Sequence, residues 1–325
     1  MKILIHHPSI GGNLGDRVIL EGTERLLSWA YEDFEVIYSN RIYDPREIDL
    51  FVMAGTPWIW DMCDRSDKYR QLEEIIESLP VKTKRVALGL GSCLPLASNS
   101  FVYIFGEDPI RERTRATLVD IYSRFDFIST RDRWAYFILK LLNIDIHKGL
   151  CPAIHFIDQK DWRQDPTHPV LVFINPSTSI SAVSCDHIFS QDLLGFQKQF
   201  YQEYAPKVLL MDKSDIEWCE HAEWHYQLVE STSELVRELH HAKFVVSGRV
   251  HAAIPARLLG LQTFILPLDS RYLTAVKCGA IPVLTSGLPD FSKYLHSGDD
   301  YDPIPPTLIA LDKKYMVKRL QELFN

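Results

Sequence analysis

The chain has 325 residues and a mass of 37.5 kDa, more than one hydrophobic core usually holds, so two domains are expected. Its composition, 46% hydrophobic and 24% charged, is typical of a globular protein, and a net charge of −8 without a basic stripe argues against nucleic acid as a partner. No apolar run is long enough for a membrane span or a signal peptide, and the six cysteines form no Cys-x-x-Cys pair, which together predict a cytoplasmic protein with reduced thiols.

Short apolar runs alternate with amphipathic segments through the first half of the chain. They predict strands at residues 2–6, 35–38, 50–54, 85–90 and 127–129, each ending in small or polar residues. A glycine-rich loop follows the first strand and leads into a helix that begins near Asp16. The spacing of Gly11, Gly12 and Gly15 differs from the Gly-x-Gly-x-x-Gly fingerprint, so no dinucleotide is implied. Asp16 either caps this helix or faces a ligand.

A polar stretch with several prolines, residues 158–169, predicts a domain linker. Beyond it we expect strands at 170–174 and 207–211, helices at 195–204 and 233–240, and a closing amphipathic helix over 313–324. Strands that alternate with helices on both sides of the linker predict two Rossmann-like domains that face each other across a cleft. The expected domains are residues 1–160 and 170–310, with residues 311–325 as the closing helix.

The most informative stretch is residues 244–267. An apolar run ends at Ser247 and Gly248, and Arg249 and His251 then precede an apolar-periodic segment that closes at Gly260, a pattern typical of strand, turn and helix. The amides and the positive dipole of a helix N-terminus favour an anion, and here a cation and a titratable imidazole stand beside them. Because open α/β sheets bind ligands at the carboxyl ends of their strands, we interpret this turn as an anion site rather than as a cap.

Three further groups allow two readings each. Arg131, after the strand at 127–129, either points a second cation towards the same edge or pairs with Asp132. Trp58, Trp60 and Trp134 either stack on sugars or pack inside the protein. The stretch from His221 to His225 reads His-x-Glu-x-His, with its Glu one place away from the zinc-binding pattern, so an exposed surface segment is expected instead of a metal site.

Four segments together resemble the polysaccharide pyruvyl transferase family, from residue 3 to about residue 267. Gly12-Asn13-Leu14-Gly15-Asp16 is similar to its Asn-x-Gly-Asp loop, and residues 88–96, which include Gly91 and Ser92, are similar to its Gly-x-Gly-x-x-Pro-Leu segment. Ser129-Thr130-Arg131-Asp132 is similar to its Arg-Asp helix start, and residues 247–252 to its Arg-x-His-Ala signature. The chain departs from the family at Thr56-Pro57-Trp58, where a Gly-rich turn is usual, and at Cys151-Pro152, where Asp-Pro is usual.

The resemblance implies a GT-B-like fold and transfer of a pyruvyl group from phosphoenolpyruvate to two hydroxyls of a sugar, forming a cyclic ketal. The acceptor would be a sugar or glycan precursor, lipid-linked forms included, and no cofactor or metal is expected. A histidine can move the necessary protons near neutral pH, so His251 is the expected acid and base, with Asp16 as a second group. The expected substrate-binding residues are Arg249, Arg131, Gly12, Asn13, Gly15, Ser247, Gly248, Gly91 and Ser92.

Two other functions stay open at this point. A nucleotide-sugar glycosyltransferase of the same fold would hold a diphosphate with a similarly placed cation. A non-catalytic sugar-binding homologue would account for the departures at residues 56–58 and 151.

Overall fold

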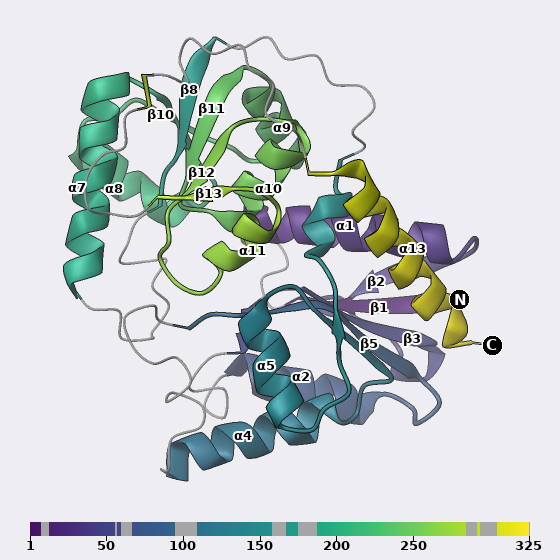
Figure 1. Ribbon diagram of the computed structural model, residues 1–325. Helices are drawn as coiled ribbons and strands as arrows, with labels where there is room; N and C mark the ends of the chain where they lie inside the picture. Colours follow the sequence, from purple (N-terminus) through teal and green to yellow (C-terminus); the bar gives the residue numbers. More distant parts are fainter. Residues whose placement is uncertain are drawn as a thin grey trace. The chain divides into compact units, whose positions relative to one another are not determined.

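The computed structural model describes residues 1–7, 13–55, 57–59, 67–94, 109–157, 167–174, 187–283, 291–292 and 304–324. The chain divides into two compact units. The first contains residues 1–10, 19–156 and 310–325, and the second contains residues 11–18 and 157–309. Figure 1 shows that each unit is built on a sheet with helices packed beside it. None of the described helices is long and apolar enough to cross a membrane.

The described strands of the first unit form a parallel sheet in the order β2-β1-β3-β5-β6-β7, with β4 paired to β5 beside this path. The strands are β1 (Lys2–His6), β2 (Glu35–Tyr38), β3 (Leu50–Ala54), β4 (Pro57–Ile59), β5 (Lys84–Ser92), β6 (Phe127–Thr130) and β7 (His147–Lys148). The order reverses between β1 and β3. At such a switch point the loops that follow two neighbouring strands diverge and leave room for a ligand.

Helices cover this sheet. They are α1 (Leu14–Ala30), α2 (Asp67–Ser78), α4 (Pro109–Tyr122), α5 (Arg133–Leu141) and α13 (Pro306–Glu322), with short 3₁₀ turns at Pro45–Glu47 and Pro152–His155. The core on one face joins β1, β3 and β5 to α2, α4 and α5. Buried polar contacts fasten α13, because the Asp312 carboxylate accepts a hydrogen bond from the Leu150 amide at 3.0 Å and pairs with His155 at 3.0 Å. The hydroxyl of Tyr31 also donates to the Leu320 carbonyl at 2.7 Å.

The sheet of the second unit is also parallel among the strands described, in the order β10-β9-β8-β11-β12-β13. Its strands are β8 (His168–Val172), β9 (Lys207–Leu210), β10 (Tyr226–Leu228), β11 (Ala242–Ser247), β12 (Thr263–Ile265) and β13 (Ile281–Pro282). Its helices are α7 (His187–Tyr204), α8 (Ile216–His221), α9 (Thr232–His240), α10 (Val250–Leu258) and α11 (Tyr272–Lys277), with a 3₁₀ turn at Lys213–Asp215. Counted within the unit, this is the 3-2-1-4-5-6 order of the Rossmann fold, with its switch point between β8 and β11.

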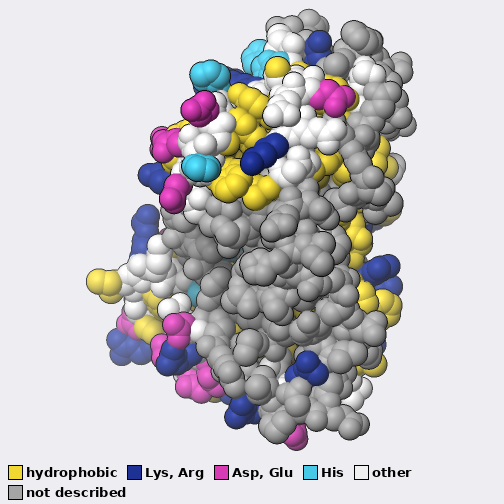
Figure 2. Space-filling view, turned by 90° about the vertical axis from the view of Figure 1, so that its left-hand side faces the viewer, with side chains coloured by type: hydrophobic (Ala, Val, Ile, Leu, Met, Phe, Trp, Pro, Cys, Tyr) yellow, Lys and Arg dark blue, Asp and Glu magenta, His cyan; other side chains and the backbone are white. Residues whose placement is uncertain are grey.

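Aromatic side chains fill the core between α7 and the second sheet. Phe200, Phe244 and Phe291 meet at ring-centroid distances of 5.3 to 6.2 Å. Outside them, Tyr201 of α7 stacks on Trp224 with centroids 4.7 Å apart. Figure 2 shows the face that carries α7 and α8, where hydrophobic side chains gather in the upper part.

Most predicted elements of the sequence are confirmed. The first three predicted strands coincide with β1, β2 and β3, and the closing helix is α13. His221 and His225 are both exposed, as expected of a surface segment. Arg131 does not begin a helix, because α5 begins at Arg133 and Asp132 caps it. Residues 158–166 of the predicted linker lie outside the described residues.

The three tryptophans for which sugar stacking or packing stayed open differ from one another. Trp58 is fully buried in the first unit, so the sugar-platform reading is wrong for this side chain, which packs in the core instead. Trp134 is partly buried against the same core. Trp60 lies outside the described residues.

A buried histidine ends the first strand. The Nδ1 atom of His6 lies 2.7 Å from the Ser39 hydroxyl, and its ring lies 6.4 Å from that of Phe51 and 5.5 Å from that of Trp58. The imidazole is 4% exposed, and its burial lowers the pKa of His6 to about 4. His6 is therefore neutral in the folded protein at pH 7, and protonating it would place a charge among aromatic rings.

This histidine should make folding sensitive to mild acid. Above an ordinary pKa of about 6.5, His6 is neutral in both states and contributes no pH dependence. Between about pH 6.5 and pH 4, the imidazole is protonated in the unfolded chain but stays neutral in the folded chain. As the pH is lowered through this range, the free energy of unfolding therefore decreases by up to about 3 kcal/mol, and below it the decrease levels off. We expect His6→Gln to remove this component. Urea unfolding of both proteins at pH 7 and pH 4.5 checks it, and equal pH slopes would contradict it.

Candidate functional site

The switch point of the second unit is closed by a glycine that no other residue can replace. Gly248 follows β11, and its amide donates to the Val172 carbonyl at the end of β8 at 3.1 Å. A Cβ atom on Gly248 would lie 2.2 Å from Cγ2 of Ile174, a distance that real side chains do not reach. The close approach of these two chains requires glycine, and it fixes where the next residue, Arg249, leaves the sheet.

A serine holds the turn that follows. The Ser247 hydroxyl accepts a hydrogen bond from the Arg249 amide at 3.0 Å and donates to the Arg249 carbonyl at 2.7 Å. Helix α10 then begins at Val250. Arg249 occupies the N-cap position, but its side chain makes no capping bond to the helix. The predicted strand, turn and helix are therefore confirmed, with the arginine on the turn.

The guanidinium of Arg249 is anchored by a buried carboxylate. Its Nη2 lies 2.5 Å from Oδ2 of Asp215, which is fully buried, and the arginine side chain itself is 14% exposed. The Nε atom of Arg249 is buried and has no hydrogen-bond partner among the described residues. A guanidinium carries five N–H donors, so one carboxylate oxygen satisfies only part of this group. Asp215 therefore holds the Arg249 guanidinium in one orientation, and the remaining N–H groups of the guanidinium can bind a second anion.

Residues 13–18, which include the first turn of α1, belong to the same unit. The Asn13 side chain accepts from the Gly15 amide at 2.8 Å and so caps the start of α1. The Leu14 amide donates to the Met211 carbonyl at 3.4 Å, next to the end of β9. Arg17 donates from Nη1 to the Glu230 carbonyl at 3.1 Å. These bonds fasten the first turn of α1 to the loops that follow β9 and β10.

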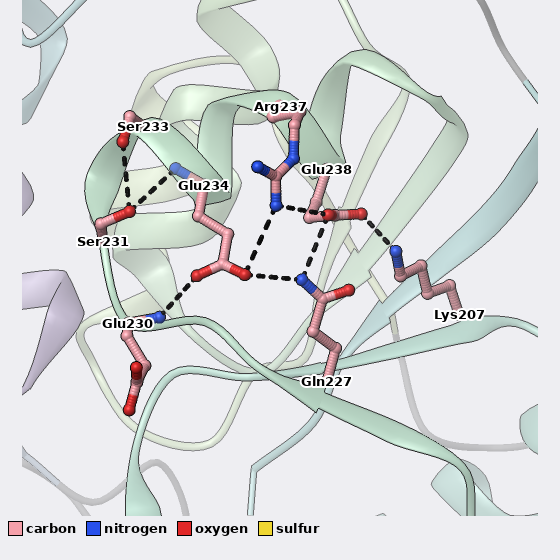
Figure 3. A network of polar contacts seen from close by, with 8 residues as sticks. All are labelled: Lys207, Gln227, Glu230, Ser231, Ser233, Glu234, Arg237 and Glu238. Carbon is pink, nitrogen blue, oxygen red and sulfur yellow. Dashed lines mark hydrogen bonds and ion pairs between the residues drawn. The ribbon is translucent and has the colours of Figure 1, made fainter.

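Figure 3 shows why the Glu230 backbone is a firm anchor. Its amide donates to the Glu234 carboxylate at 2.9 Å, and the Ser231 hydroxyl accepts from the Glu234 amide at 3.1 Å. Gln227 of β10 donates to the same glutamate at 2.7 Å. Ser231 therefore caps α9, and Glu234 holds the amide of the residue before the cap, Glu230, whose carbonyl accepts the bond from Arg17.

His251 lies in the first turn of α10 and packs against the first turn of α1. A Cβ atom built on Gly15 would lie 3.1 Å from the Cβ and 3.3 Å from the Nδ1 of His251. Asp16, the next residue, is half-buried on the same turn. The first turns of two helices thus meet at the histidine, and Arg249 precedes it by two residues. Their partial and full positive charges favour an anionic ligand.

The remaining predicted site residues form a second group, in the first unit. Arg131 follows β6, is fully buried, and lies so close to β5 that a Cβ atom on Gly91 would be 2.4 Å from its Nε. Its Nη1 donates to Sγ of Cys151 at 3.6 Å. The Cys151 sulfur is only a weak acceptor for this arginine.

Ser92 and Asp132 bind each other inside the first unit. The Ser92 amide and hydroxyl donate to the two oxygens of the Asp132 carboxylate at 2.7 and 2.9 Å. The Ala135 amide donates to the same carboxylate at 2.8 Å, which makes Asp132 the cap of α5. Burial raises the pKa of Asp132, while these hydrogen bonds oppose the rise. The Ser92 hydroxyl thus makes a structural hydrogen bond, which holds the end of β5 next to the residue that follows Arg131.

The predicted residues therefore gather in two places. Asn13, Gly15, Asp16, Ser247, Gly248, Arg249 and His251 lie in the second unit, and Gly91, Ser92 and Arg131 lie in the first. Gly12 lies outside the described residues. Within the described part of the chain, no three His, Cys, Asp or Glu side chains come together as a group that could hold a metal ion.

Our reading of the sequence missed Asp215. This residue sits at the end of a short 3₁₀ turn that follows β9, one strand away from the switch point. The signal was present, because the strand at 207–211 was predicted and acidic residues follow it directly. A polar loop after a parallel strand belongs to the same sheet edge as the loop that carries Arg249.

Because Gly15 lies close to His251, adding a single methyl group at position 15 should lower kcat. Gly15→Ala would push the imidazole by a few tenths of an ångström, and we expect kcat to fall by about tenfold, because misplacement by about 1 Å can cost 100-fold. Gly195→Ala is the matched control, since nothing lies within 4 Å of a Cβ there, and it should stabilise α7 by up to about 1 kcal/mol. Steady-state kinetics and thermal unfolding of both variants check this, and an unchanged kcat in Gly15→Ala would contradict it.

A family model described as polysaccharide pyruvyl transferase matches residues 13–270. No curated protein sequence matches the chain.

The fold is similar to those of several solved structures. A UDP-GlcNAc 2-epimerase of Methanocaldococcus jannaschii, solved with UDP-GlcNAc and UDP, matches with a TM-score of 0.58 at 10% identity, covering 99% of this chain and 100% of the epimerase. The enzyme of Neisseria meningitidis matches with a TM-score of 0.51 at 11% identity over 99% and 100%. An uncharacterised protein of Klebsiella pneumoniae has a TM-score of 0.50 at 15% identity over 87% and 92%. At these identities the likeness shows the fold alone, which is the predicted GT-B-like α/β class with two parallel sheets.

Proposed function

Because the chain belongs to the polysaccharide pyruvyl transferase family, we propose that it transfers the pyruvyl group of phosphoenolpyruvate to two hydroxyls of a sugar in a glycan or glycan precursor. The reaction releases phosphate and closes a cyclic ketal. Two observations carry the proposal. His251 packs against Gly15, and Arg249, two residues before His251, is anchored by the buried Asp215 carboxylate. An imidazole and a cation two residues apart at the switch point of a Rossmann-type sheet support this proposal.

The donor is an anion with two charged ends, a carboxylate and a phosphate. Arg249 supplies a guanidinium that is already oriented by Asp215, so binding the donor costs little side-chain entropy. The start of α10 adds backbone amides next to it. We assign Arg249 to the donor.

The chemistry needs four proton transfers. The first sugar oxygen bonds to the enol carbon while its proton passes to the Asp16 carboxylate, and His251 delivers a proton to the methylene carbon. The bond from the former enol carbon, which now carries the sugar oxygen, to the phosphate oxygen then breaks, and the departing phosphate takes the proton from Asp16. The second sugar hydroxyl attacks the resulting oxocarbenium carbon and gives its proton to His251, which restores the enzyme. Arg249 stabilises the charge that builds up on the departing phosphate.

A substrate panel tests this function. The protein is incubated with phosphoenolpyruvate and lipid-linked or nucleotide-linked sugars, and both phosphate release and the mass of the acceptor are measured. Equal amounts of phosphate and of product heavier by pyruvate minus water are expected. Phosphate release without a mass gain, or transfer of a sugar from a nucleotide sugar, would overturn the proposal.

Ligand-induced stabilisation separates the donor classes. We expect phosphoenolpyruvate to raise the unfolding temperature, because a ligand at 100 times its Kd stabilises the folded state by about 2.7 kcal/mol. UDP and UDP-sugars should leave it unchanged. Stabilisation by UDP alone would favour a glycosyltransferase, and stabilisation by sugars without either donor would favour a sugar-binding protein.

A further inference from the structure

Helix α13 exposes apolar side chains on one line. Leu308, Leu311 and Tyr315 are 37%, 66% and 37% exposed, and their spacing of three and four residues puts them on one face of the helix. The opposite face packs inward through Met316 and Leu320, which are 2% and 0% exposed. The Tyr315 hydroxyl lies 2.6 Å from Nδ1 of His147, so the fold uses this side chain in part, and Leu311 is the most exposed apolar side chain of the three.

Lysines follow the side of this ridge. A groove of about 490 Å³ between α13 and Trp29 is lined by Lys313, Lys314 and Lys318, and its remaining lining residues are Ala310, Val317 and Gln321. None of these lining residues is acidic. The ammonium of Lys313 lies 3.4 Å from the centre of the Trp29 ring, which holds that charge in the groove. Figure 1 shows the helix in yellow.

The nearby carboxylates neutralise this surface only in part, and Lys313 and Lys314 carry most of its charge. Asp312 is turned inward, where it binds the Leu150 amide and His155. Glu322, at the end of the helix, lies 2.7 Å from Arg319 and 3.7 Å from Lys318. A positive patch therefore stands beside an exposed apolar ridge in a chain whose net charge is −8.

We propose that α13 docks on the surface of a membrane that contains anionic lipids. Leu308, Leu311 and Tyr315 enter the interface between headgroups and acyl chains, and the lysines bind lipid phosphates, with the groove beside Trp29 receiving a headgroup. Opposite charge favours this partner over a second copy of a chain that is itself acidic. Three apolar side chains are too few to anchor the protein alone, so binding is reversible and weakens as salt rises. The proposal is independent of the reaction assigned to the second unit.

Vesicle co-sedimentation of the full chain tests it. Vesicles of phosphatidylcholine with about one-third phosphatidylglycerol should bind the protein, and vesicles of phosphatidylcholine alone should not. Because each lysine at an anionic surface contributes about fivefold, Lys314→Gln with Lys318→Gln should weaken binding about 25-fold. Leu311→Ser should weaken vesicle binding about tenfold, because the variant loses the favourable transfer of a leucine side chain from water into the membrane interface.

Helix α5 offers matched controls in the same unit. Leu141 is 53% exposed, and Lys140 is also exposed. Leu141→Ser and Lys140→Gln therefore make the same kinds of substitution on a different helix, and they should leave vesicle binding unchanged. Circular dichroism shows that each variant is folded. Equal losses in the α5 variants, binding to soluble polyglutamate but not to vesicles, or a Leu311-dependent dimer that ignores vesicles would each overturn the proposal.

Discussion

Replacing His251 by alanine is expected to lower kcat by about 100-fold to 10,000-fold, the usual contribution of a positioned acid–base group. Binding of phosphoenolpyruvate should stay within about threefold, because Arg249 and the amides at the start of α10 remain in place. His251 lies on the helix surface next to Gly15 rather than deep in the core, so the fold should tolerate the change. Single-turnover kinetics and calorimetric titration with the donor measure the two quantities separately.

Arg249→Ala provides the opposite pattern. It should abolish measurable donor binding, because it removes the anchored cation. Arg237→Ala, which removes an arginine that is 62% exposed on α9, should change neither quantity and serves as the control. If Arg249→Ala and His251→Ala retained equal activity, the assignment of both residues would be rejected.

Removing Asp215 should have the largest effect on stability. Asp215→Ala leaves the mostly buried Arg249 guanidinium without its carboxylate, and breaking one side of a buried ion pair costs about 3 to 5 kcal/mol. The double variant Asp215→Ala with Arg249→Met should recover most of this loss, because it removes the stranded charge as well. Urea unfolding of the wild type, both single variants and the double variant gives the coupling free energy.

An exposed pair supplies the comparison for this experiment. Asp44 and Arg46 lie 2.7 Å apart, but their side chains are 36% and 86% exposed. Solvent screens such a pair, so Asp44→Ala should lower the free energy of unfolding far less than Asp215→Ala does. If Asp215→Ala were as mild as Asp44→Ala, the Arg249 guanidinium would not depend on its buried partner, and its proposed pre-orientation would be wrong.

Much of the fold could be predicted because its strands are short apolar runs bounded by small or polar residues. The run that ends at Ser247 is one example, since an apolar segment followed by Gly248 and Arg249 specifies both a buried strand and a sharp exit from the sheet. Secondary structure of this kind is encoded locally. The same local signal placed Arg249 and His251 at the edge of the sheet, where the structure has them.

The contacts within the site could not be predicted in the same way. Asp215 is 34 residues before Arg249, and only the order of β9, β8 and β11 in the sheet brings their loops together. Ser92 was expected to bind substrate, yet its hydroxyl donates to Asp132, a partner 40 residues away. Periodicity in a sequence reports which face a residue occupies, but it carries no information about which distant side chain shares that face.

The assignment of residues 11–18 to the second unit and of residues 310–325 to the first has a consequence for biosynthesis. The ribosome makes residues 310–325 after the whole of the second unit, so Asp312 reaches His155 and Leu150 only when that unit has already emerged. The first unit, although translated first, is completed last. In a chain truncated after residue 309, the surface of the first unit that α13 covers would stay exposed to solvent. The first unit should then need chaperones to avoid aggregation.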